Sequence, residues 1–172
     1  MATTAKKNTE YRTNVRRFLG KVVINAGVGR ASQQGNFADK ILPQIMSDFA
    51  AIAGQQPHIR KAKQSIAGFK IREGQIVGVR VTLRGGKMVD FFERFITITL
   101  PRVRDFGGIN RHNIDTNGNL NYGIKEQYVF TEVSPENSPF TFSLQVTLVP
   151  KSGQGGTAID KYLELGVPLK KS

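Results

Sequence analysis

The segment Gln75–Arg84 constrains the fold more than any other part of the chain, because every second residue from Val77 to Leu83 is a branched aliphatic one. The intervening positions include Arg80 and Thr82. A period of two is typical of a β-strand with one face in a core and the other exposed. The segment therefore predicts a strand with an apolar face, which helices must cover, and a cationic face.

Two further segments, Asn119–Lys125 and Phe140–Leu148, share this design, and Lys21–Val28 and Pro57–Lys61 are predicted as additional strands. The polar faces of the three alternating strands hold Arg, Thr, Asn and Gln but no Asp or Glu. An antiparallel sheet commonly leaves one face open in this way. The sequence therefore predicts an α+β fold in which helices pack on one face of an antiparallel sheet.

The segment from Phe37 to Ile52 places apolar residues at helical spacing. Asn36 is expected to cap the start of this helix and Gly54 to end it. Pro43 lies inside the segment, and proline has no N–H and collides with the preceding turn. It either kinks the helix or lies in its first turn.

A second helix is predicted to open at Gly85 and to end at Pro101, with its aromatic residues facing the sheet. The polar stretch Arg102–Gly118 follows and is interpreted as an ordered loop, because long connections are usually functional. Ala158–Leu165 is predicted to form a short closing helix.

Residues 1–17 contain five Lys or Arg and the single acid Glu10, which predicts a basic, mobile N-terminal arm or a frayed short helix. Residues 18–172 contain no linker or internal repeat and are predicted to form one domain. No apolar run is long enough for a membrane span, and no secretory signal is visible. We therefore expect a soluble, intracellular protein without a membrane partner.

The chain carries 25 Lys and Arg against 13 Asp and Glu, a net charge of +12, which attracts polyanions. The stretch His58–Arg72 holds five of these cations and no acid. It overlaps Ala62–Gly74, a predicted flexible connection that we interpret as a basic finger contacting phosphate; the alternative is a solvated run of charges without a ligand. Together with the acid-free strands, this charge predicts that the open face of the sheet is an RNA-binding face.

The residues for enzyme chemistry are few, because there is no Cys and the two histidines are far apart. No catalytic residue, metal site or cofactor is predicted.

Gly27 and Gly29 resemble a dinucleotide turn, but Ser32 stands at the third glycine position. A simple turn and an approach to RNA phosphate are the alternatives. Asp90 and Glu93 are interpreted as a solvated helix face. An RNA-dependent enzyme and a free-standing RNA-binding regulator remain the alternative classes.

Four long strings carry a resemblance to a known family: KVVINAGVG from Lys21, GQQPHIRKAKQSIAGFKIREGQIVGVRVTLRG from Gly54, FITITLPRVRDFGGIN from Phe95 and YGIKEQYVF from Tyr122. The chain resembles bacterial-type large-subunit ribosomal protein L five over about Lys21 to Pro168. The resemblance implies a non-enzymatic protein of the central protuberance that binds 5S rRNA. It also implies contacts with large-subunit rRNA, P-site tRNA, neighbouring ribosomal proteins and the small-subunit head, in a cytoplasmic ribosome or an organellar one.

The resemblance assigns polar contacts with 5S rRNA to Asn25, Gln55 and Thr82, two of which lie on the polar faces of predicted strands. We add the arginines of the strands to this predicted 5S rRNA site: Arg60, Arg80 and Arg84. The resemblance further assigns the finger to the tRNA elbow. Its expected contact residues are Lys63, Ser65, Phe69, Lys70 and Arg72.

The chain departs from the family in its long loop, where Gly107 stands at a position that is commonly arginine and Asp115–Asn119 reads DTNGN rather than DGRGN. The loss of two cations predicts a weaker contact with the small subunit. The segment before Lys21 is shorter than in the family, so we expect its first helix to be reduced or absent. Thr131–Phe142 is also compressed.

Overall fold

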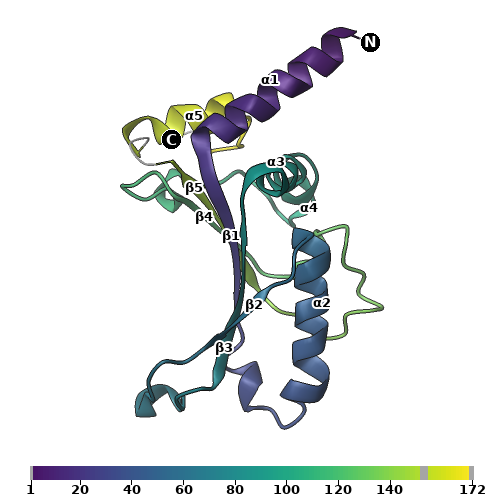
Figure 1. The fold of residues 1–172 in the computed structure, drawn as a ribbon, viewed down its shortest axis with the longest axis vertical. Coiled ribbons are helices and arrows are strands. Elements are labelled where there is room, and N and C mark those ends of the chain that lie inside the picture. The colour runs from purple at the N-terminus through teal and green to yellow at the C-terminus, as the bar shows by residue number, and fades with distance from the viewer. Residues whose placement is uncertain (1, 152–154, 171–172) are drawn as a thin grey trace. The chain divides into compact units, whose positions relative to one another are not determined.

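The computed structural model describes residues 2–151 and 155–170, with side chains described from Thr9 onward. Its strands form a five-stranded antiparallel sheet in the order β2-β3-β1-β5-β4, so the predicted α+β fold is confirmed (Figure 1). The strands are β1 (Leu19–Gly27), β2 (His58–Lys61), β3 (Ile76–Leu83), β4 (Leu120–Ile124) and β5 (Leu144–Pro150).

The α-helices are α1 (Ala2–Phe18), α2 (Leu42–Ala53), α3 (Gly85–Arg94), α4 (Leu100–Arg102) and α5 (Ala158–Glu164). The chain divides into two compact units, which we describe separately. Unit 1 comprises Met1–Val23, Thr82–Tyr122 and Val146–Ser172, and unit 2 comprises Ile24–Val81 and Gly123–Gln145. The single domain inferred from the sequence remains a prediction.

The alternation in the sequence corresponds to two faces of the sheet. In β3, Val79 and Val81 are fully buried while Arg80 between them is exposed. In β1, Ile24 and Ala26 are buried while Asn25 is exposed. In unit 2, α2 lies along one face of these strands (Figure 1), so the aliphatic side chains form a core beneath the helix. The predicted separation of an apolar face from a polar face is confirmed.

One strand is shorter than predicted, because β5 begins at Leu144 rather than at Phe140. The backbone N–H of Phe140 donates to Gln44 Oε1 at 3.2 Å, and that of Phe142 donates to Gln127 Oε1 at 3.0 Å. These amide side chains satisfy backbone groups that a neighbouring strand would otherwise bind. The alternation of buried and exposed residues nevertheless starts before the strand does.

Pro43 lies in the first turn of α2, as one of the two alternatives predicted. A π-helical turn, Phe37–Ile41, precedes it, and the N–H of Leu42 donates to the carbonyl of Phe37 five residues earlier. The wider turn accommodates the proline ring, which would collide with a regular helical turn. The expected cap is wrong, since the Asn36 side chain makes no capping hydrogen bond; Gly54 ends the helix in the left-handed conformation with φ +62°.

Pro101 does not end the second helix as predicted. A π-helical turn, Phe95–Thr99, follows α3, and α4 then continues through Arg102 with Pro101 in its first turn. The N–H of Leu100 donates to the carbonyl of Phe95, again five residues earlier. A π-helical turn therefore accommodates a proline in each unit.

The N-terminal segment forms the 17-residue helix α1, so of the two expectations, a reduced or an absent first helix, the absent one is wrong, and residues 2–17 are helical instead of an irregular arm. In unit 1, Tyr11 Oη donates to the carbonyl of Leu165 at 3.2 Å. The Arg12 guanidinium bonds both Asp90 and Glu93 of α3. These two acids, interpreted from the sequence as a solvated face, thus hold α1 against α3.

The loop Arg102–Gly118 is ordered, as predicted, by backbone and side-chain hydrogen bonds within unit 1. The N–H of Ile109 donates to the carbonyl of Pro168 at 2.7 Å. Asp115 accepts hydrogen bonds from Asn119, and the bond from the Asn119 side chain lowers the pKa of the Asp115 carboxyl. Tyr162 Oη donates to the carbonyl of Gly118 at 3.0 Å, and burial raises the pKa of this phenol.

A buried polar cluster in unit 2 holds the segment before β5 against α2. Ser138 Oγ donates to Asp48 Oδ2 and accepts from Gln44 Nε2 at 2.6 Å and Gln127 Nε2 at 3.2 Å. Ser138 is 1% exposed and Asp48 is 9% exposed, so these bonds are largely shielded from water. A buried polar group that loses its partner carries the full cost of its desolvation.

We expect Ser138→Ala to lower the free energy of unfolding by about 1–3 kcal/mol, because it removes the hydroxyl that donates to Asp48. Urea denaturation followed by circular dichroism measures the loss. Ser143→Ala, at an exposed position of unit 2, is the control and should change stability by less than about 0.5 kcal/mol. Equal stability of the Ser138→Ala variant and the wild type would contradict a supporting role for the cluster.

Candidate nucleic-acid interface

The open face of the sheet in unit 2 brings together three residues of the predicted 5S rRNA site. β2 and β3 pair antiparallel, with Arg60 opposite Gly78 and His58 opposite Arg80. A Cβ added at Gly78 would lie 3.8 Å from Arg60 Cβ and 3.9 Å from Asn25 Oδ1. The same Cβ would lie 3.2 Å from the carbonyl oxygen of Ala26, so glycine at this buried position lets Arg60 and Asn25 stand close together, with Arg80 two residues further along β3.

The strands carry no negative charge. None of the five contains Asp or Glu, whereas β2 contains Arg60 and Lys61 and β3 contains Arg80. Arg60, Lys61 and Arg80 are exposed. This arrangement can neutralise phosphates without repelling them, and the exposed amide of Asn25 can bind a base edge or a ribose hydroxyl.

The other predicted members of the site lie elsewhere. Gln55 is half-buried in the bend between α2 and β2 and is not on a strand. Thr82 and Arg84 belong to unit 1, where Thr82 is half-buried in β3 and Arg84 is exposed at the start of α3. The three heavy atoms nearest to a Cβ added at Gly78 belong to Ala26, Arg60 and Asn25 and not to these residues.

Sequence reasoning missed a depression on the same face of unit 2. It has a volume of about 420 Å³ and is lined from β1, β5 and β4, which are neighbours in the sheet. Its exposed lining residues are Asn25, Gly27, Gly123, Lys125, Ser143 and Gln145. The alternation in Phe140–Leu148 was the available signal, since it places Ser143 and Gln145 on the polar face.

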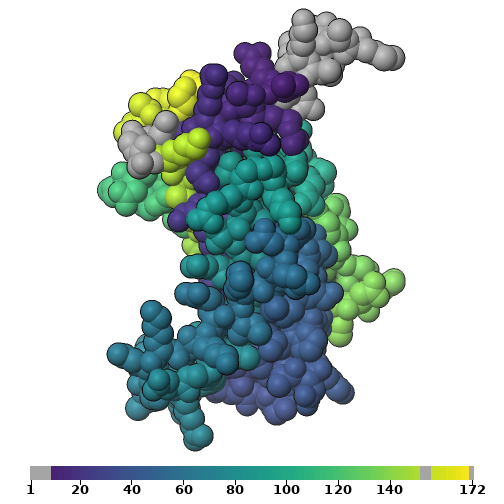
Figure 2. All heavy atoms as spheres, in the orientation of Figure 1, coloured from purple at the N-terminus to yellow at the C-terminus, as the bar shows by residue number. Residues whose placement is uncertain are grey.

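The finger, Ala62–Gly74, was predicted as a flexible connection, and in the structure it is a hairpin. Ile66 and Ile71 form an antiparallel bridge, and Lys70 adopts the left-handed conformation with φ 53° at the turn. Ser65 Oγ accepts from the N–H of Glu73 at 2.9 Å, so this predicted contact residue also closes the hairpin. In Figure 2 the finger stands out from the rest of unit 2.

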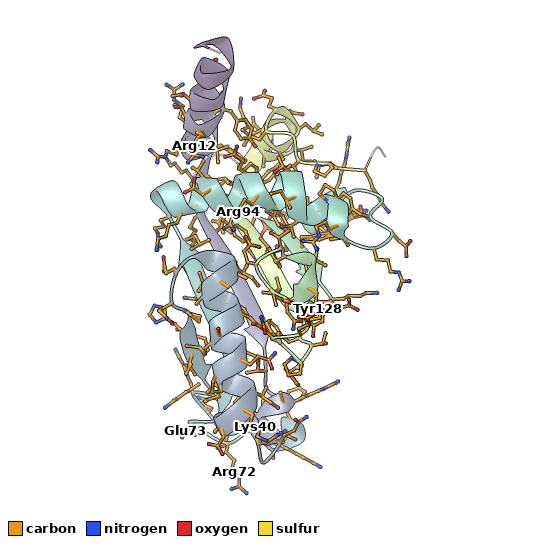
Figure 3. All side chains as sticks on the ribbon, turned by 90° about the vertical axis from the view of Figure 1, so that its right-hand side faces the viewer. Arg12, Lys40, Arg72, Glu73, Arg94 and Tyr128 are labelled. Carbon is orange, nitrogen blue, oxygen red and sulfur yellow. The ribbon has the colours of Figure 1, made fainter. Side chains whose placement is uncertain are left out.

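The finger exposes both cations and an aromatic ring. Lys63, Lys70 and Arg72 are exposed, and the Arg72 side chain extends away from the ribbon (Figure 3). Phe69 is 72% exposed, so it does not anchor the finger in a core. Together with Ile71 it lines a second depression of about 400 Å³, completed by Gly27, Gly29, Arg30 and Gln33.

Two other features, a metal centre and a membrane-spanning helix, can be assessed in the part of the chain that the structure describes. Residues 2–151 and 155–170 contain no group of three or more His, Asp, Glu or Cys placed to hold a metal ion. In the same part of the chain, every helix is too short or too polar to cross a membrane.

Comparison with known proteins gives a consistent result along the chain. Residues 18–72 match the family model described as ribosomal protein L5, and residues 76–161 match the model for the C-terminus of the same ribosomal family. The chain is 43% identical over 153 residues to the large ribosomal subunit protein uL5 of Tropheryma whipplei, covering 89% of this chain and 81% of that protein.

Two further relatives carry the same name. The uL5 protein of Pseudothermotoga lettingae is 42% identical over 153 residues, covering 89% of this chain and 81% of that protein. That of Bifidobacterium longum is 40% identical over 152 residues, covering 88% and 78%. The chain therefore belongs to the ribosomal protein L5 family, a family of structural, non-enzymatic proteins of the large ribosomal subunit.

Proposed function

We propose that this protein binds 5S rRNA through the open face of its sheet and so helps to build the central protuberance of the large subunit. The observation that carries the proposal is the composition of the strands, which contain arginines, amides and hydroxyls but no Asp or Glu. A structured RNA presents phosphates together with ribose hydroxyls and base edges. The open face offers a complementary group for each.

The contact residues in this proposal are Asn25, Arg60 and Arg80 around Gly78, with Gln55, Thr82 and Arg84 as further members. Arginine binds phosphate oxygens through a planar fork of donors. Asparagine supplies one donor group and one acceptor, which suits a base edge or a 2′-hydroxyl. Arginines thus account for affinity, and the amide and hydroxyl groups account for orientation.

The finger has a separate partner in this proposal, the elbow of P-site tRNA. Its exposed cations suit tRNA phosphates, and the exposed ring of Phe69 suits stacking on an unpaired base. Other basic surfaces contact large-subunit rRNA and neighbouring ribosomal proteins. This division leaves the sheet and the finger free to act independently.

Contact with the small-subunit head would depend on the loop Arg102–Gly118, which lacks two of the family's cations. A Cβ added at Gly107 would lie 3.9 Å from Lys170 Nζ. Lys170 thus supplies a positive charge next to the position where the family commonly has arginine. We propose that the bridging contact uses this lysine together with Arg104 and Arg111, which are exposed.

The affinity for 5S rRNA should fall steeply with salt, because each neutralised phosphate releases counterions. The expected slope is about 0.7–0.9 log units of affinity per decade of salt for each phosphate contact. Filter binding of the isolated protein to a 5S rRNA transcript at several salt concentrations measures it. An affinity that stays constant across the series would remove the electrostatic part of the proposal.

Asn25→Ala and Thr82→Val should each weaken 5S rRNA binding by about 1–2 kcal/mol without altering the fold, because each removes a polar contact at the interface. The same binding assay measures the loss, and thermal unfolding checks the fold. Asn36→Ala is the control for Asn25→Ala, since Asn36 is an exposed asparagine of unit 2 outside the strands. Wild-type affinity in both test variants would show that the sheet face is the wrong surface.

Replacing Lys63, Lys70 and Arg72 by alanine should lower the affinity of ribosomes for P-site tRNA while leaving their 5S rRNA content unchanged. The defect should be small, because exposed charge contacts are individually weak and the rest of the ribosome also holds the tRNA. Reconstituted particles allow both quantities to be measured, with Lys40→Ala as the control cation outside the finger. Loss of 5S rRNA with normal tRNA affinity would overturn the division of roles.

A further inference from the structure

Two glycines on the open face of unit 2 occupy positions where the fold does not require glycine. A Cβ added at Gly27 or at Gly123 would meet no atom within 4 Å, and neither residue has a positive φ. Gly78 differs, because its added Cβ would lie 3.2 Å from the carbonyl oxygen of Ala26. Glycine within a strand is destabilising relative to alanine. Neither packing nor backbone conformation therefore explains Gly27 and Gly123.

Both glycines line the depression of about 420 Å³ that crosses β1, β5 and β4. Asn25 stands beside Gly27 on the same face of β1, and Ser143 precedes β5. A volume of this size lies within the range of small-molecule sites, about 300–1,000 Å³. Side chains at the two glycine positions would project into space that is now open.

The chemistry of the depression differs from that of the neighbouring strands. Its polar lining consists of amide and hydroxyl groups with Lys125 as the one cation among the residues that line it. Arg60 and Arg80, which suit phosphates, lie on β2 and β3 instead. Amides and hydroxyls pair with ribose hydroxyls and base edges; a duplex displays these groups only along its shallow minor groove, whereas an unpaired nucleotide can enter a depression.

We infer that this depression receives one unpaired nucleotide of the bound RNA, with its ribose and base edge against Asn25 and Ser143. Gly27 and Gly123 keep the floor open so that the nucleotide can approach the backbone closely. This inference rests on the proposed function, in which the open face binds 5S rRNA, and it adds which part of the RNA lies where.

The test compares Gly27→Ala and Gly123→Ala with Gly35→Ala, all in the full chain. Gly35 is the matched control, because an added Cβ there also meets no atom within 4 Å and the residue lines neither depression. All three variants should unfold at or above the wild-type midpoint. Gly27→Ala and Gly123→Ala should bind a 5S rRNA transcript about tenfold more weakly, and Gly35→Ala should bind as the wild type does.

The salt dependence distinguishes a ribose and base in the depression from a phosphate group in the depression. Gly27→Ala and Gly123→Ala should leave the slope of affinity against salt unchanged. Chemical acylation of 2′-hydroxyls should reveal one unpaired nucleotide that the wild-type protein protects and the Gly123→Ala protein does not.

Each alternative result overturns the inference. Wild-type affinity in both glycine variants would overturn the inference and leave the proposed function standing. A weaker affinity with a reduced salt slope would place a phosphate in the depression, and lower stability would give the glycines a structural role; both overturn the inference. A wild-type protein that does not bind 5S rRNA would overturn the inference and the proposed function together.

Discussion

The aliphatic side of the sheet must be covered by helices, and this requirement determines which side of the strands stays exposed. Val79, Val81 and Ile24 are fully buried, and each is followed along its strand by a residue that faces the other way. Once helices take the apolar side, the opposite side of the strands in unit 2 is left with exposed polar residues such as Asn25, Arg60 and Arg80. The acid-free strands carry exposed arginines on that side, which suits the proposed polyanionic partner.

The strands were predictable because alternation is a local property of the sequence, and β3 shows this most clearly. The start of β5 was not predictable, because the side chains of Gln44 and Gln127 bind the backbone of Phe140 and Phe142 in place of a neighbouring strand. The docking of α1 could not be predicted from the sequence either. It includes the pairing of Arg12 with Asp90 and Glu93, residues about eighty positions away that no spacing rule connects.

The candidate site shows the same division between local and non-local information. The polar faces of the strands could be read from the sequence, and they include Asn25 and Arg80. The sequence does not reveal that Gly78 separates Asn25 from Arg60, because this depends on the pairing of β2 with β3 and on the sheet order. The depression beside β5 was missed for the same reason, since its walls come from three strands.

The two π-helical turns also make the length of the chain important, and not only its composition. Each contains one residue more than a regular helix would use before the Leu-Pro pair at Pro43 or Pro101. Removing that residue would rotate the following segment by about 100° around the helix axis. Leu100, now fully buried, would turn away from the core while the proline ring met a regular turn. At these two points the protein should tolerate a change of residue far better than the loss of one.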